Sequence, residues 1–81
     1  MIYSIVFEKI NDSTLPDGFY YAHVPALDLT THGLGIEGAK NAALDLIKLW
    51  IEEKKANKEL IPIELESYFS KVEIEDAVLS T

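Results

Sequence analysis

The spacing of apolar residues changes along the chain, and each spacing predicts a different element. From Ile2 to Ile10, β-branched and aromatic residues occupy both parities, as in a strand that is apolar on both faces. Phe19 to Val24 is a second run of this kind. The residues between the two runs are rich in turn formers and end in Pro16-Asp17-Gly18. The two runs are therefore predicted to pair as a hairpin.

A third strand is predicted from Leu27 to His32, where apolar and polar residues alternate so that one face is exposed. Gly33 and Gly35 follow, and glycine adopts backbone angles that other residues avoid. A helix is predicted to begin near Ile36 and to end near Asn57.

The predicted helix has an unusually wide apolar arc. At about 100° per residue, its polar residues form one stripe. That stripe contains Asn41, Asp45, Lys48, Glu52 and Lys55, and the opposite face contains Ile36, Ala39, Ala43, Leu46, Ile47 and Trp50. Leu44 and Ile51 flank this face on one side, and Ala42 and Leu49 on the other. The arc is about twice as wide as one core-facing stripe, which favours a homodimer or a protein partner.

A fourth strand is predicted after the loop in which Pro62 prevents the helix from continuing. Over residues 68–75, Tyr68, Val72 and Ile74 are expected to point inward, and Phe69, Lys71, Glu73 and Glu75 outward. The segment DAVLST is then a short tail. The order β-β-β-α-β predicts a single α+β domain over residues 1–81, with a mixed sheet and one long helix packed on one face. The helix is expected to make a right-handed crossover.

Composition narrows the class of protein. A chain of 81 residues with 48% hydrophobic residues forms only a small core, which oligomerisation commonly supplements. The net charge of −7 argues against nucleic acid as a direct partner. The N-terminus has no signal-peptide pattern, and the apolar stretches are too short to span a bilayer. Together with the lack of cysteine, this favours a cytoplasmic protein without membrane contact.

Two motifs resemble ligand sites but fall short of them. His23 and His32 are close in sequence, yet only Asp28 lies between them as a further ligand, and zinc needs three or four protein ligands. We expect both histidines on the surface of the sheet. Three glycines surround the predicted helix start but match neither phosphate-binding pattern, so a tight strand-to-helix turn is expected. These glycines are Gly33, Gly35 and Gly38.

The acidic residues Glu8, Glu37 and Glu73 lie on elements that are neighbours in this predicted fold. Clustered, they would bind Mg²⁺ for phosphodiester cleavage. No basic groove accompanies them, and Glu37 suits a helix N-terminus in any protein. No serine lies in a G-x-S-x-G elbow. We therefore expect no catalytic, metal-binding or cofactor-binding residues, and a protein that is not an enzyme.

The chain resembles the HicB-like antitoxin family over about residues 2–62. The family pattern has an aromatic strand ending in Val-Pro, a short strand, a glycine followed by Glu and Ala, an Ala-rich helix and then Ile-Pro. The matching residues are Tyr21, Val24, Pro25, Leu27, Gly33, Ile36, Glu37, Ala39, Ala42, Trp50, Glu52, Ile61 and Pro62. Two turns depart from the pattern: ALDLT replaces a Pro-Gly-Cys-like turn, and LG replaces Asp-Thr.

This resemblance implies a truncated ribonuclease H-like fold without catalytic acids. It also implies binding to a small basic toxin of the HicA type, which cleaves mRNA. Many such antitoxins carry a C-terminal DNA-binding domain, which we do not expect here. Exposed candidates for contact with the toxin are Glu8, Asp28, His32, Glu73 and Glu75. The alternatives are a solitary HicB-like module with a structural or ligand-binding role and, more remotely, a remnant of a metal-dependent nuclease.

Overall fold

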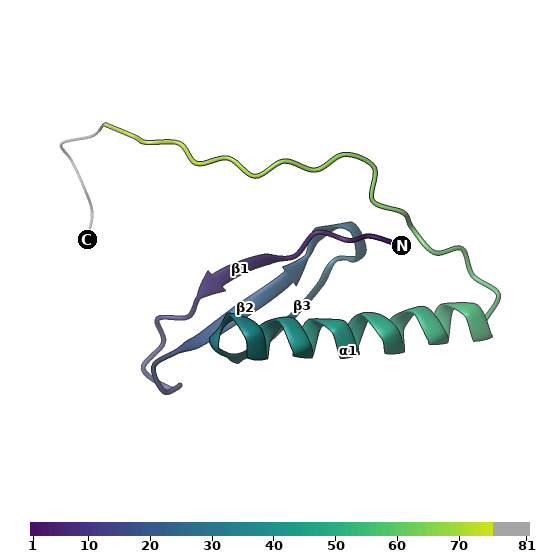
Figure 1. Ribbon diagram of the computed structural model, residues 1–81, viewed down its shortest axis with the longest axis horizontal. Coiled ribbons are helices and arrows are strands. Elements are labelled where there is room, and N and C mark those ends of the chain that lie inside the picture. Colours follow the sequence, from purple (N-terminus) through teal and green to yellow (C-terminus); the bar gives the residue numbers. More distant parts are fainter. Residues whose placement is uncertain (76–81) are drawn as a thin grey trace.

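The computed structural model describes residues 1–75 and shows a small α+β domain, in which a three-stranded antiparallel sheet is followed by one long helix (Figure 1). The elements are β1 (Val6–Lys9), β2 (Phe19–Val24), the 3-10 helix η1 (Pro25–Leu27), β3 (Leu29–Leu34) and α1 (Gly35–Ala56). The strand order is β1-β2-β3, so β2 is central. The predicted hairpin is confirmed as the antiparallel pair of β1 and β2.

The two faces of the sheet follow from its register. Ala22 lies opposite Phe7 on β1 and Thr31 on β3, and these residues face α1. The next residue along each strand points to the other side. Tyr21 therefore lies on the opposite face, between its partners Glu8 and His32.

The core is small and lies between α1 and the inner face of the sheet. Its buried residues are Ala22, Val24, Leu27, Ala39, Ala43 and Ile47. The helix residues facing this core increase in size toward the C-terminus, from Ala39 and Ala43 to Ile47 and then the half-buried Ile51. Such a gradient brings the start of the helix closest to the sheet.

The closest approach is made by backbone rather than by side chains. A Cβ atom placed on Gly33 of β3 would lie 2.5 Å from the carbonyl carbon of Gly38 and 2.6 Å from the backbone nitrogen of Ala39. Both distances are far below van der Waals contact, so only glycine fits at position 33. Gly35 has a φ of +69°, and its N–H donates to the carbonyl of Gly18 at 2.7 Å. The chain thus passes directly from β3 into α1, which confirms the predicted tight strand-to-helix turn.

The C-terminus of α1 is closed by a Schellman motif. The N–H of Glu59 donates to the carbonyl of Lys54 at 2.9 Å, and the N–H of Lys58 to that of Lys55 at 3.0 Å. Lys58 takes the left-handed conformation, with φ of +56°. Lys54 also forms an ion pair with Glu59 at 3.3 Å and lies 5.2 Å from the centre of the Trp50 ring. The helix ends within one residue of the predicted position.

Several predicted boundaries were wrong. β1 begins at Val6 rather than Ile2, although Tyr3 and Ile5 still pack against the core. The third strand is shifted by two residues, because Pro25 begins a 3-10 turn. Asp28 ends that turn in the left-handed conformation, with φ of +52°. Proline fixes its own φ near the helical value, which suits the first position of such a turn.

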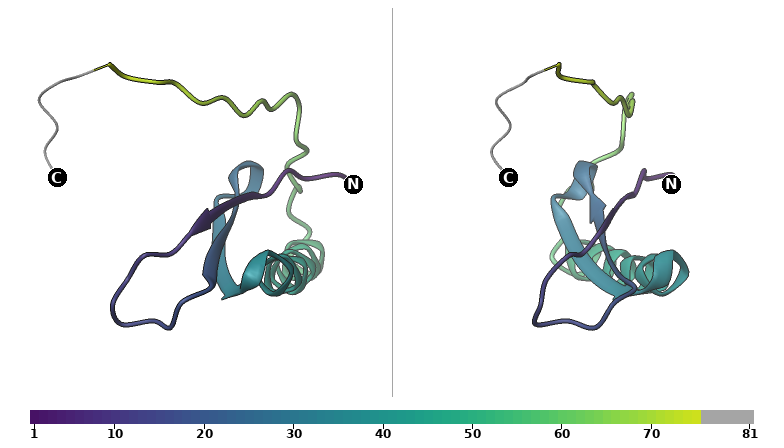
Figure 2. Two further views of the ribbon diagram at one scale, coloured as in Figure 1. Left: turned by 60° about the vertical axis from the view of Figure 1, so that its left-hand side comes forward. Right: turned by 90° about the vertical axis from the view of Figure 1, so that its left-hand side faces the viewer.

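The predicted fourth strand is the main error. Residues 68–75 form no strand, so the sheet is antiparallel rather than mixed and α1 makes no crossover between paired strands. Tyr68, Val72 and Ile74 were expected to point inward, yet they are 84%, 78% and 73% exposed. The segment DAVLST lies outside the described residues. We call residues 60–75 the arm, and both views in Figure 2 show it running apart from the sheet.

The dimensions of the molecule agree with an arm that does not pack. The radius of gyration is 15.9 Å, with extents of 52 × 30 × 18 Å. A compact domain of this length has a radius of gyration of about 12 Å. An alternating sequence is therefore not sufficient for a strand, because a strand also needs a paired edge.

We predict that the substitution Gly33→Ala destabilises the fold by about 2–3 kcal/mol, because the new methyl group overlaps helix backbone that cannot move aside independently. Gly38→Ala is the matched control. A Cβ at position 38 lies 3.6 Å from its nearest neighbour, and alanine stabilises a helix relative to glycine by up to about 1 kcal/mol. Urea unfolding followed by circular dichroism measures both variants. Equal stability of the two would contradict the close approach at Gly33.

Candidate functional site

The face of the sheet opposite α1 is the candidate site, and no helix of residues 1–75 covers it. Its side chains form cross-strand rows that follow from the register. One row is Glu8, Tyr21 and His32, and a second is Val6, His23 and Thr30, with Phe19 and Leu34 beside them. We call these eight residues the open face.

Contacts within the open face hold its polar and aromatic groups in place. His23 Nδ1 lies 2.6 Å from the Thr30 hydroxyl oxygen across the strands. The rings of Phe19 and His32 have centroids 6.2 Å apart and are tilted by 46°. Tyr21 stands at the centre of the face and is 41% exposed. The result is a surface of aromatic, imidazole and carboxylate groups on a rigid sheet.

Such a surface is suited to binding another protein. Tyrosine is among the residues that most often dominate protein interfaces, because it supplies a large apolar ring and one hydroxyl group with little loss of side-chain freedom. Glu8, the cross-strand neighbour of Tyr21, adds a negative charge to this surface.

The five residues predicted for partner contact are divided among three places. Glu8 and His32 share one row of the open face. Asp28 lies at the turn between η1 and β3, and Glu73 and Glu75 lie on the arm. Asp28, Glu73 and Glu75 therefore lie outside the open face. Sequence reasoning missed Tyr21, which lies between Glu8 and His32, because its position depends on pairing between strands.

The predicted alternatives for ligand chemistry gain no support. Glu8 lies on the open face, Glu37 in the first turn of α1 on the other layer, and Glu73 on the arm. No group of three or more His, Cys, Asp or Glu residues within the described part of the chain could hold a metal ion. The two histidines lie on the sheet surface, as predicted. Gly33 packs against helix backbone, so the glycines form a tight turn rather than a phosphate loop.

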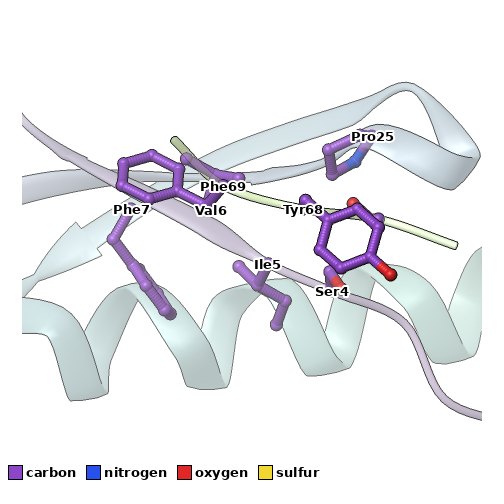
Figure 3. A pocket seen from close by; sticks show the side chains of 8 residues that line it. Ser4, Ile5, Val6, Phe7, Pro25, Tyr68 and Phe69 are labelled. Atoms are coloured by element: carbon purple, nitrogen blue, oxygen red, sulfur yellow. The ribbon is translucent and has the colours of Figure 1, made fainter. Parts of the chain in front are cut away.

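A second feature is the cleft between β1 and the arm, which has a volume of about 560 Å³ (Figure 3). Figure 3 shows Phe69 of the arm near Val6 and Phe7 of β1, and Tyr68 near Ser4 and Pro25. The side chains approach the strand, but no backbone hydrogen bond joins the arm to the body within residues 1–75. The cleft is therefore an open gap beside a sheet edge.

The arm is fastened to the body at its start. The hydroxyl of Ser4 donates to one carboxylate oxygen of Glu64 at 2.6 Å, and the N–H of Ser4 donates to the other at 2.7 Å. The Tyr3 hydroxyl donates to the carbonyl oxygen of Pro62. The Ser4 side chain and backbone hold the pKa of Glu64 below its usual value, because both hydrogen bonds favour the charged carboxylate.

No protein-family model matches this chain, and no curated protein or solved structure is significantly similar to it. Within residues 1–75, no helix is long and apolar enough to cross a membrane.

We predict that the attachment of the arm depends on the charge of Glu64. Because its pKa is lowered in the folded protein, the contact is complete above the usual pKa of a glutamic acid and is lost as the pH falls through the lowered value. In a ¹H–¹⁵N spectrum, the Ser4 amide should lie downfield at neutral pH and move upfield with that midpoint. The variant Glu64→Gln should abolish the titration, while Glu66→Gln on the same arm should leave it unchanged. An amide that is insensitive to Glu64→Gln would contradict the contact.

Proposed function

We propose that this protein is a HicB-like antitoxin that binds a small basic toxin of the HicA type and occludes the surface with which the toxin cleaves mRNA. The proposal makes it a binding protein rather than an enzyme. The resemblance over residues 2–62 and the net charge of −7 both support a basic protein partner.

The observation that supports this proposal most directly is the row Glu8, Tyr21 and His32 on a sheet face that no helix of residues 1–75 covers. In this proposal Tyr21 is the apolar anchor, and His32 packs beside it. Glu8 orients the basic toxin and accelerates its association. Leu34 is 64% exposed at the end of β3 and extends the apolar contact.

A homodimer is part of this proposal. The apolar arc of α1 extends beyond the core, and Leu44 and Leu49 remain exposed on its two sides. A domain with so few buried residues gains stability when a second copy covers such a surface.

The decisive experiment is to co-express the chain with a small basic protein encoded beside its gene and to measure RNA cleavage by that protein. A stable complex without cleavage supports the proposal. A neighbouring toxin that neither binds nor loses activity contradicts it and favours the solitary module. For that alternative the cleft between β1 and the arm is the natural ligand site.

We predict that Tyr21→Ala raises the dissociation constant of the toxin complex at least tenfold, or about 1.4 kcal/mol, because truncation of a central aromatic residue removes the main apolar contact. Asp45→Ala is the control, since Asp45 is exposed on the polar stripe of α1 in the other layer. Titration of RNA cleavage with each variant gives the two constants. Similar constants for Tyr21→Ala and wild type would place the toxin away from the open face.

A further inference from the structure

We propose that two copies of this chain exchange their arms, with residues 68–75 of each copy adding a strand to the free edge of β1 in the other. The inference identifies the surface of the homodimer proposed above. It does not depend on the antitoxin activity, because no toxin enters its test.

Among residues 1–75, no strand pairs with the outer edge of β1, the edge away from β2. The N–H of Ile10 donates to the carbonyl of Phe19 at 2.9 Å, which identifies the residues of β1 that face β2. The backbone N–H and C=O groups of successive residues point to opposite edges of a strand. Those of Val6 and Glu8 therefore also point toward β2, and those of Phe7 and Lys9 point to the free edge. An exposed edge of this kind pairs readily with another extended segment.

The arm is the extended segment that this edge lacks. Residues 68–75 have the alternation of a strand, and Val72 and Ile74 on its apolar face are mostly exposed. Within the described chain, the backbone groups of the arm have no backbone partner. A single chain therefore contains both a free strand edge and an extended segment, but the two do not pair with each other. The arm is nevertheless attached beside β1 through Glu64.

The surface beside β1 matches the apolar face of the arm. Helix α1 packs against β2 and β3, so β1 is the strand with the least cover on the helix side of the sheet. A groove of about 340 Å³ lies between α1 and the residues just before β1, and it is lined by Tyr3, Ile5, Ile47 and Ile51 together with the 41% exposed Leu44. A strand added to β1 and continued alongside Ile5 and Tyr3 would place alternate side chains over this groove. Val72 and Ile74 are the residues that would fill it.

A second copy is the occupant that agrees best with these observations. Addition of a strand to an exposed edge is a common mode of recognition, and mutual exchange satisfies the symmetry of a dimer by using the same surface twice. Local charge does not oppose it, despite the net charge of −7. Glu8 and Lys9 on β1 and Lys71 and Glu73 on the arm are mixed in sign.

The first test is the solution mass of the full chain. We expect twice the 9.1 kDa of one chain, by light scattering or sedimentation. The double variant Val72→Ser/Ile74→Ser should raise the dimer dissociation constant at least tenfold. Both residues are exposed in the single chain, so their replacement should leave the fold intact. The control is Lys71→Ser/Glu73→Ser, which changes two neighbours on the other face without altering the net charge.

The second test identifies whose arm lies on β1. The chain contains no cysteine, so any disulfide arises from introduced residues. A chain with Glu8→Cys is mixed with a chain carrying Lys71→Cys and oxidised gently, because Glu8 and Lys71 would share the face of the extended sheet that points away from α1. Arm exchange predicts a covalent pair containing one chain of each kind.

Three outcomes would overturn the inference. The first is a monomer at all concentrations. The second is a dimer whose dissociation constant is the same in the Val72→Ser/Ile74→Ser variant. The third is the absence of a disulfide between the two singly substituted chains together with a disulfide inside one chain that carries both Glu8→Cys and Lys71→Cys, since the arm would then pair with its own β1.

Discussion

The close contact between β3 and the start of α1 governs the rest of this structure. At Gly33, the strand meets helix backbone with no space for a side chain, and Ala39 and Ala43 continue the contact with small residues. The helix therefore packs against β2 and β3, and β1 has little cover on the helix side of the sheet. The same contact that fixes the strand-to-helix turn therefore leaves the β1 edge of the sheet exposed.

A core built from small residues has an energetic consequence. Alanine buries little apolar area, and the hydrophobic contribution grows with the area removed from water. Val24 and Ile47 are among the few larger side chains that are buried, while Leu44, Leu49 and Leu34 stay exposed. The apolar residues that would make the fold more stable lie at its surface. Both proposed partners would bury part of this exposed apolar surface.

The sequence predicted what depends on local pattern and missed what depends on pairing. The hairpin, the helix and the glycine turn follow from periodicity and backbone preference, and all three are confirmed. β3 begins two residues later than predicted because Pro25 starts a 3-10 turn. From sequence alone, a proline that starts such a turn looks the same as one that only ends a strand. The fourth strand failed for a different reason. Residues 68–75 have the alternation of a strand, but no sequence pattern states whether an edge is paired.

The candidate site, too, could be predicted from the sequence only in part. Glu8 and His32 were identified because they are polar and exposed, whereas Tyr21 between them emerged only from the register of three strands. Register also separates the two surfaces for which we propose partners. The open face uses side chains that point away from α1, and the β1 edge uses backbone groups in the plane of the sheet. A strand added at the edge would extend the open face rather than cover it, so the proposed dimer and the proposed toxin complex are geometrically compatible.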